Sequence, residues 1–376
     1  MKVLFWIGLF GALYSYFLYP LLLMPLSRRR RRPLQPPAEL PTISLIVTAH
    51  NEAARIKDKL ENCLLLDYPR QRLEILVASD ASSDGTDELV AGYAERGVRL
   101  IRAPERRGKE WAQLLAVQAA RGEILVFSDV ATTIPGDGLR RLAACFADPQ
   151  VGAVSSEDRF VAPDGELLGE GLYVRYEMWL RRLESGAAGL VGLSGSFFAA
   201  RREVCLDWDV LVPSDFNAAL NCVRHGYIAV TEPTLLGFYP AIQDEDQEYQ
   251  RKLRTVLRGI TGLMRRLDVL NPLRYGLFSF QVFSHKLMRW LVPWFLLLLL
   301  VASARLAREH AIYALALAGQ LAFYLLVLGG TLSERLRRLS WVKVPYFFVT
   351  ANLAVAQAGI DFLRGKRVTA WQPSKR

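Results

Sequence analysis

Apolar and polar positions divide the chain into an alternating middle and uninterrupted apolar stretches toward both ends. In the middle, four apolar runs have the length of β-strands and cover residues 43–49, 73–79, 98–101 and 123–128. Turn residues and stretches of helical periodicity follow these runs, as in residues 52–66, 84–95 and 109–120. Strands that alternate with helices at this spacing predict right-handed βαβ units around a mostly parallel sheet, which is a Rossmann-like α/β domain.

The apolar stretches predict membrane-spanning helices on both sides of this domain. No charged residue lies between Lys2 and Arg28, and about 25 apolar or weakly polar residues are enough to cross a bilayer. Residues 289–305 and 311–330 predict two further spans that form a helical hairpin. Residues 344–360 are a shorter apolar stretch with basic residues on both sides, so a crossing, a re-entrant segment and an interfacial helix all stay open.

This pattern predicts five parts. They are a membrane helix at 1–27, a basic and Pro-rich linker at 28–41, the α/β domain at 42–272, a C-terminal membrane region at 273–363 and a basic tail at 364–376.

Composition and charge agree with a membrane protein. The chain is 52% hydrophobic and carries a formal charge of +10, to which the block 28–32 contributes five arginines. Arginines after a span, rather than before it, favour a cytoplasmic α/β domain over a cleaved secretory signal, in a multi-pass protein of the cytoplasmic membrane. The excess charge therefore does not predict a nucleic-acid partner. The four cysteines form no C-x-x-C pair, which argues against a zinc site or a disulfide framework and suits a reducing compartment.

Polar residues follow three of the four predicted strands. His50, Asn51 and Glu52 end the first, residues 79–86 end the second, and Ser128 and Asp129 end the fourth. Ligands of parallel sheets bind beyond the carboxyl ends of the strands. Taken singly, residues 84–86 could cap the next helix and Glu52 could favour a helix N-terminus. Their occurrence together on one rim favours a binding site.

The chemistry of this rim predicts a nucleotide and a metal ion. No G-x-G-x-x-G or Walker loop follows any of the strands, so a dinucleotide or P-loop site is not expected. Carboxylates accept hydrogen bonds from base N–H groups and ribose hydroxyls, and they hold divalent ions that bridge phosphates.

At this point the chain resembles the family 2 glycosyltransferases with a GT-A fold, in particular the membrane-anchored bacterial enzymes of exopolysaccharide and cell-envelope synthesis. The resemblance covers nearly the whole chain, and its motifs occur in the family's order. They are VTAHNE (47–52), DASSDGT (80–86), RRGKEWA (106–112), FSDVAT (127–132), GLSGSFFAARRE (192–203), SDF (214–216), HGYIAVTEP (225–233) and RKLRTVLRG (251–259).

The resemblance assigns the donor side of the site. It implies that Asp80 binds the nucleotide base, with Ala49, Asn51 and Glu52 lining the same pocket. Asp129 would lie near the ribose and diphosphate and hold a divalent cation, Mg²⁺ or Mn²⁺. The family often carries a second acid or amide two residues later, where this chain has Ala131.

The resemblance also assigns a general base and two cations. Asp215 matches the last acid of the family's E-D or D-D motif and would remove the proton of the acceptor hydroxyl; the alternative is an N-cap of the helix that follows. Lys109 and Arg254 would neutralise the departing diphosphate, although Lys109 could equally be a solvated residue at a helix start. Glu157 and Asp158 could reach the acceptor pocket or lie in a solvated turn.

These assignments predict an inverting glycosyltransferase that moves a hexosyl or N-acetylhexosaminyl group from a nucleotide-diphosphate donor to a membrane-associated acceptor, either a lipid-linked glycan or an envelope polysaccharide. Processive relatives carry Q-x-x-R-W, and residues 251–255 keep only the arginine, as Arg254. A processive synthase, with or without a partner subunit, is therefore the second alternative. A catalytically inactive scaffold is the third, because Ala131 breaks the metal motif. A transporter is disfavoured, because the spans lack paired charges.

Overall fold

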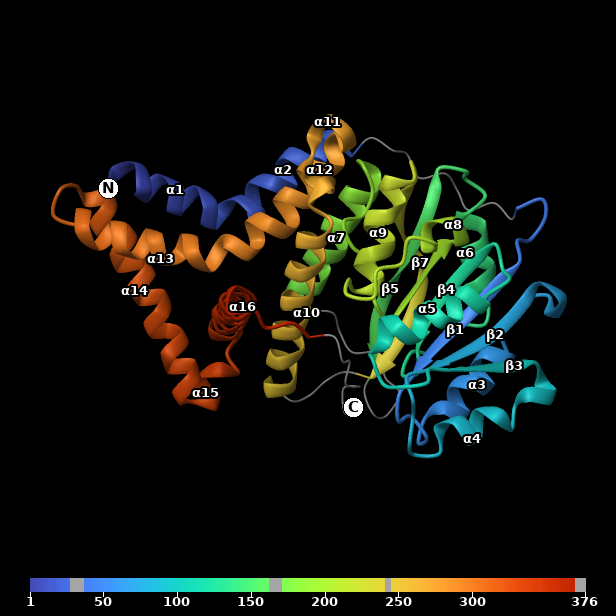
Figure 1. Ribbon diagram of the computed structural model, residues 1–376. Helices are drawn as coiled ribbons and strands as arrows, with labels where there is room; N and C mark the ends of the chain where they lie inside the picture. Colours follow the sequence, from blue (N-terminus) through green and yellow to red (C-terminus); the bar gives the residue numbers. More distant parts are fainter. Residues whose placement is uncertain (28–36, 162–170, 241–244, 369–376) are drawn as a thin grey trace. The chain divides into compact units, whose positions relative to one another are not determined.

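The computed structural model describes residues 1–27, 37–161, 171–240 and 245–368 (Figure 1). The predicted arginine block at 28–32, most of the linker and most of the basic tail lie outside these residues. The chain forms two compact units. The first, called the helical unit here, comprises Met1–Leu22, Gln243–Ile260 and Val282–Arg367. The second, called the sheet unit, comprises Leu23–Ile242, Thr261–Gln281 and Val368–Arg376.

A mixed sheet of seven strands forms the centre of the sheet unit, in the order β3-β2-β1-β4-β6-β5-β7. Within this sheet β6 alone runs antiparallel to its neighbours. The strands are β1 Ile43–Ala49, β2 Leu73–Ser79, β3 Val98–Arg102, β4 Ile124–Asp129, β5 Val151–Val161, β6 Phe197–Arg201 and β7 Ile228–Pro240. The predicted α/β class with a mostly parallel sheet is confirmed.

Strands β1, β2 and β4 follow directly from the sequence, because strands covered on both faces are continuous apolar runs. All seven residues of β1 are buried. Its register pairs Ala49 with Ser79 of β2 and Thr48 with Asp129 of β4. The carboxyl ends of these three parallel strands therefore meet at one rim, which brings their polar residues together.

Helices cover both faces of the sheet (Figure 1). One apolar core packs β1 and its neighbours against Ile56 and Leu60 of α3 and Leu139 of α6. The other packs the opposite face against Ala116 of α5 and Ala219 of α9. The helices of this part are α3 Ile56–Leu64, α4 Thr86–Ala91, α5 Lys109–Ala119, α6 Gly138–Cys145, α7 Leu172–Gly186, α8 Arg202–Cys205 and α9 Ser214–Arg224, with single 3₁₀ turns η3 Arg70–Arg72 and η4 Ala94–Arg96.

Helix α10 (Glu245–Arg265) contributes residues to both units, and the turns η5 (Leu267–Leu270) and α11 (Pro272–Tyr275) follow it in the sheet unit. In the helical unit, the Tyr249 hydroxyl of α10 donates a hydrogen bond to Gln357 Oε1 at 2.7 Å.

Four helical segments among the described residues are long and apolar enough to cross a membrane, namely Lys2–Leu26, Leu277–Leu306, Ala311–Leu332 and Ser340–Leu363. This composition marks the chain as a membrane protein. The second segment begins 12 residues before the predicted start at residue 289, because a π turn over Phe283–Leu287 continues the helix past His285 and Lys286. The elements are α1 Lys2–Leu13, η1 Tyr14–Leu18, α2 Tyr19–Leu23, η2 Met24–Leu26, α12 Leu277–Val282, η6 Phe283–Leu287, α13 Met288–Leu306, α14 Ala311–Leu332, α15 Glu334–Arg337 and α16 Ser340–Leu363.

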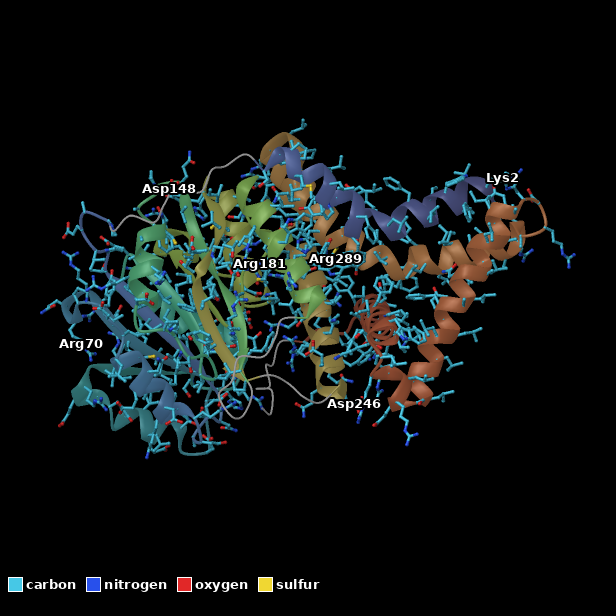
Figure 2. All side chains as sticks on the ribbon, turned by 180° about the vertical axis from the view of Figure 1, so that it is seen from behind. Lys2, Arg70, Asp148, Arg181, Asp246 and Arg289 are labelled. Atoms are coloured by element: carbon cyan, nitrogen blue, oxygen red, sulfur yellow. The ribbon has the colours of Figure 1, made fainter. Side chains whose placement is uncertain are left out.

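Helices α1 and α13 pack closely because α1 carries glycines where they meet. A Cβ atom at Gly8 would lie 2.9 Å from the backbone nitrogen of Leu299, and one at Gly11 would overlap the Phe295 ring. Small residues of this kind let helix backbones approach in membranes. An ion pair of 3.2 Å joins Lys2, labelled in Figure 2, to Glu309.

Candidate functional site

The carboxylate of Asp80, directly after β2, is fully buried and faces backbone amides. It accepts hydrogen bonds from the N–H groups of Arg107 at 2.9 Å and Gly108 at 3.0 Å. The backbone N–H of Asp80 donates to the carbonyl of Ala49 at 2.9 Å. Asp80 therefore ties the ends of β1 and β2 to the loop before α5. Base binding by Asp80, with Ala49 in the same pocket, stays a prediction.

Asn51 and Glu52 bind the 79–86 loop to the end of β1. Asn51 has a positive φ of 53°, and its Oδ1 accepts from the backbone N–H of Ser83 at 2.9 Å. The backbone N–H of Glu52 donates to Thr86 Oγ1 at 2.8 Å. The Glu52 carboxylate pairs with Arg55 at 2.6 Å. Burial raises the pKa of Glu52, although Arg55 opposes the shift.

Asp84 binds the start of α4, whose N-cap residue is Gly85 and has no side-chain cap bond. Its Oδ1 accepts from the backbone N–H of Thr86 at 3.0 Å, and its Oδ2 accepts from that of Ala53 at 3.0 Å.

Asp129, at the end of β4, pairs with a lysine rather than with a second acid. The Lys109 ammonium, at the first position of α5, lies 2.6 Å from Asp129 Oδ1 and also donates to the Gly195 carbonyl at 3.0 Å. Lys109 is 7% exposed, so the interpretation of this residue as a solvated helix start is wrong. The Asp129 side chain keeps 27% exposure and stays accessible to a ligand.

Gly195 connects this pair to Asp215. A Cβ atom at Gly195 would lie 3.6 Å from Asp215 Oδ2. Asp215 lies in the first turn of α9, whose N-cap residue is Pro213 and has no side-chain cap bond. The N-cap interpretation of Asp215 is therefore wrong. The structure thus brings Asp129, Lys109 and Asp215 together around one glycine, from β4, α5 and α9.

Asp158, in the second half of β5, lies in a cradle of serine hydroxyls. Its carboxylate accepts from Ser194 Oγ at 2.6 Å and Ser196 Oγ at 2.6 Å, and more distantly from Ser156 Oγ at 3.4 Å. Burial raises the pKa of Asp158, while the hydroxyls and Arg181 oppose the shift. The solvated-turn interpretation of Asp158 is wrong. Its two near partners flank Gly195, so Asp158 holds the loop that contacts Lys109.

Glu157 is fully buried and forms a bidentate ion pair with Arg182, with distances of 3.0 and 2.9 Å. The solvated-turn interpretation of Glu157 is therefore wrong as well. Glu157 braces β5 against α7.

Sequence reasoning missed Lys59 of α3 and the serines beside Gly195. Lys59 is 3% exposed, and its ammonium donates to Ser128 Oγ at 2.7 Å, below the end of β4. Burial lowers the pKa of Lys59. The position of Lys59 among the apolar residues of α3 was the feature of the sequence that could have identified it. For Ser194 and Ser196 the signal was a pair of hydroxyls on both sides of a glycine.

Arg254 belongs to the helical unit. The predicted site acids Asp80, Asp129 and Asp215 belong to the sheet unit. Burial and the neighbouring Arg258 and Arg251 lower the pKa of Arg254. A guanidinium stays charged in spite of such a shift. Contact between Arg254 and a diphosphate stays a prediction.

Asp129 is the predicted ligand for a divalent cation. No group of three His, Cys, Asp or Glu side chains within the described ranges could hold a metal ion. Asp129 still fits a cation of the Mg²⁺ type, which commonly takes one or two carboxylates and completes its shell with water and substrate phosphates. Lys109 occupies one carboxylate oxygen, and the partly exposed side chain leaves room for a second contact.

Comparison with known proteins relates the first part of the sheet unit to a family. Residues 44–207 match the model of glycosyl transferase family 2. A poly-β-1,6-N-acetyl-D-glucosamine synthase of Staphylococcus aureus (strain COL) is 26% identical over 204 residues, which are 52% of this chain and 49% of that protein. A β-monoglucosyldiacylglycerol synthase of Trichormus variabilis is 25% identical over 228 residues, or 58% of this chain and 48% of that protein. The chain thus spans about half the length of the curated relatives it matches.

One solved structure resembles nearly the whole chain. It is the mannosyltransferase PcManGT of Pyrobaculum calidifontis, in complex with GDP-mannose and Mn²⁺, with a TM-score of 0.73 and 24% identity over 97% of this chain and 99% of that one. This similarity shows the fold.

Residues 44–207 form a glycosyl transferase family 2 domain, and the sheet unit has the GT-A fold. Both predictions are confirmed. The matched residues include Asp80, Lys109 and Asp129, whereas Asp215 lies beyond them.

Proposed function

We propose that the protein is an inverting glycosyltransferase that moves a sugar from a nucleoside diphosphate to a membrane-associated acceptor. The observation that carries this proposal is the link from Asp129 through Lys109 to Gly195, which lies against Asp215. This geometry supports Lys109 as the cation for the leaving group and Asp215 as the base for the acceptor hydroxyl.

The chemistry assigns a role to each of these side chains. Asp215 takes the proton of the acceptor hydroxyl as its oxygen bonds to the anomeric carbon from the face opposite the leaving group. The bond from that carbon to the diphosphate oxygen breaks, and the electron pair leaves with the nucleoside diphosphate. The contact of Lys109 with Asp129 supports Lys109 as the cation that neutralises this growing charge. A divalent cation on Asp129 would polarise the same phosphate oxygens when bound.

The donor and acceptor classes follow from the relatives and the helices. The names of two relatives specify N-acetylglucosamine and glucose, which supports a hexosyl or N-acetylhexosaminyl group. Four apolar helical segments support a membrane-associated acceptor, namely a lipid-linked glycan or an envelope polysaccharide. The arginine block at 28–32 supports a multi-pass protein of the cytoplasmic membrane, with the sheet unit on the cytoplasmic side.

Nucleoside diphosphate release tests the proposal. The full chain is purified in detergent and mixed with a panel of nucleotide sugars, a lipid extract as acceptor, and Mg²⁺ or Mn²⁺. We expect release with at least one donor, and loss of this release in Asp215→Asn. The matched control is Asp209→Asn, an acid of the same unit whose carboxylate pairs with Arg265 at 2.7 Å. Absence of release with every donor, together with absence of nucleotide binding, would favour an inactive scaffold.

A processive polysaccharide synthase is a second candidate, because a relative is named as a synthase of a polymer. The absence of the Gln and Trp of Q-x-x-R-W from residues 251–255 favours single transfer instead. Mass spectrometry of the product separates the two functions. One added sugar per acceptor supports single transfer, and a ladder of products supports polymerisation.

A further inference from the structure

Large apolar side chains are exposed just before the second apolar helical segment. Leu273 of α11 is 96% exposed, and Leu267 and Met264 are 50% and 40% exposed. Single exposed leucines are common on soluble proteins. Here three such residues lie within ten positions of the chain, and Leu277 begins the apolar segment only four residues after Leu273.

Hydrogen bonds fix the backbone of this corner, which we define as residues 267–276. The Ser279 hydroxyl donates to the carbonyls of Val269 at 2.7 Å and Asn271 at 2.9 Å. Asn271 Oδ1 accepts from the backbone N–H of Leu273 at 3.0 Å and so caps α11. Val269 is fully buried. The exposure of Leu273 is thus a property of a well-anchored turn.

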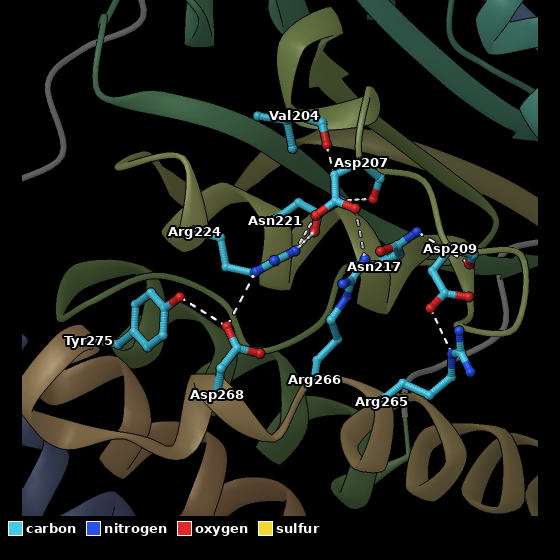
Figure 3. A network of polar contacts seen from close by, with 10 residues as sticks. All are labelled: Val204, Asp207, Asp209, Asn217, Asn221, Arg224, Arg265, Arg266, Asp268 and Tyr275. Carbon is cyan, nitrogen blue, oxygen red and sulfur yellow. Dashed lines mark hydrogen bonds and ion pairs between the residues drawn. The ribbon is translucent and has the colours of Figure 1, made fainter.

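Charged residues attach the corner to α9 (Figure 3). The Tyr275 hydroxyl donates to Asp268 Oδ2 at 3.0 Å, and Arg224 of α9 lies 3.3 Å from the same oxygen. Beside them, Arg266 pairs with Asp207 at 3.0 Å. Several charges in one network hold a geometry better than an isolated surface pair does.

We infer that the 267–276 corner inserts into the lipid surface, with Leu273 as its apolar anchor. The side chains around Leu273 are those of a membrane interface. The Arg274 guanidinium lies 5.1 Å from the centre of the Tyr275 ring. Tyrosine is enriched at the level of the headgroups, and arginine extends its charge toward anionic lipids. The apolar segment that starts at Leu277 continues this surface along the chain.

This anchor fixes the catalytic helix relative to the bilayer. Arg224 is the last residue of α9, and Asp215 lies in the first turn of the same helix. A lipid contact at the corner is therefore transmitted through Asp268 and Arg224 to the helix that carries the proposed base.

Spin labels on the full chain in lipid nanodiscs test the inference without any assay of sugar transfer. Leu273→Cys is labelled and compared with Leu65→Cys. Leu65 is 79% exposed at the end of α3, which lies far from α11 within the sheet unit in Figure 1. The four native cysteines are buried, and a labelled wild-type chain corrects for their background. Size-exclusion chromatography and circular dichroism check that each variant folds.

We expect the label at position 273 to collide with oxygen far more often than with a water-soluble nickel chelate, as lipid-exposed labels do, and the label at 65 to show the reverse. Frequent nickel collisions at 273, equal to those at 65, would overturn the inference. Low collision rates with both reagents at 273 would mean that protein covers Leu273, and would overturn it as well.

Discussion

Asp80 and Asp129 end two strands that flank β1, yet their carboxylates meet different partners. Asp80 is fully buried and accepts from two backbone N–H groups, which cannot turn away without moving the 107–108 loop. Asp129 is partly exposed and faces the ammonium of Lys109. A lysine carries its charge on a flexible stem and can follow a ligand. The two aspartates on one rim thus differ in accessibility: backbone amides of the 107–108 loop hold the buried Asp80 carboxylate, whereas part of the Asp129 side chain is exposed.

The largest effect is expected from Asp129→Asn. A neutral amide does not balance the charge of Lys109 and holds a divalent cation more weakly than a carboxylate does, so we expect sugar transfer to fall by about 10³-fold or more. Initial rates at saturating donor measure the loss. Asp137→Asn is the control, because Asp137 pairs only locally, with Arg141 at 2.6 Å. Full activity of Asp129→Asn would show that sugar transfer does not need the Asp129 carboxylate.

Replacing Lys109 tests whether its charge can move between Asp129 and a ligand. In Lys109→Met the diphosphate loses a cation, and we expect transfer to fall by about 10²-fold. Mn²⁺ binding to the enzyme without donor is expected to tighten, because the ammonium no longer competes for Asp129. Electron paramagnetic resonance titration of free Mn²⁺ measures this affinity. Lys109→Arg keeps the charge and is expected to recover part of the rate. Weaker Mn²⁺ binding in Lys109→Met would contradict the competition.

Asp80→Asn is expected to act on stability first. Asparagine keeps one acceptor oxygen, but its NH₂ group would face backbone donors, so we expect a loss of about 1–3 kcal/mol in the free energy of unfolding. The midpoint of thermal unfolding in detergent reports the change, and calorimetry with the nucleotide reports donor affinity. An unchanged midpoint with lost nucleotide binding would assign Asp80 to the base instead of the loop.

The sequence predicts those elements whose positions follow from the local hydrophobic pattern and from the parallel arrangement of neighbouring strands. Residues 43–49 and 73–79 coincide with β1 and β2, and residues 123–128 overlap β4. The carboxyl ends of these three strands place Asp80 and Asp129 on one rim. The same reasoning did not identify β5, β6 and β7 as strands. Polar residues interrupt the apolar pattern of β5, and β6 runs antiparallel between two strands.

Partners far apart in the chain were beyond sequence reasoning. The contact between Lys109 and the Gly195 carbonyl joins residues 86 positions apart, and the contact between Asp80 and Gly108 joins residues 28 positions apart. Both depend on how loops fold back over the rim. Local propensity therefore placed Lys109 at a helix start, correctly, but could not show that its ammonium points into the site.

Asp158 differs from Asp80 and Asp129 in its hydrogen-bond donors, which are serine hydroxyls instead of backbone amides or a lysine. Its pKa is raised from the ordinary value of 3.8. The folded state therefore binds this proton more tightly than the unfolded state, so the stabilising contribution is full below pH 3.8 and is lost as the pH rises through the folded pKa. Asp158→Asn removes this dependence. We expect the unfolding midpoint of the variant, relative to wild type, to be higher at pH 8 than at pH 5. A difference that does not change with pH would show that ionisation of Asp158 costs no stability.

The smallest effect is expected from Ala131→Asp, which gives Asp129 the second acid that the family often has. Ala131 is partly exposed in the turn after β4, so a carboxylate fits without displacing core side chains. It adds a ligand for a cation, but it also adds a negative charge near Asp129, which Lys109 already balances. We expect the transfer rate to stay within a few-fold of wild type and Mn²⁺ affinity to be unchanged or tighter. A loss as large as that of Asp129→Asn would mean that the site is built around a single acid and the lysine, and that a second carboxylate draws Lys109 away from the diphosphate.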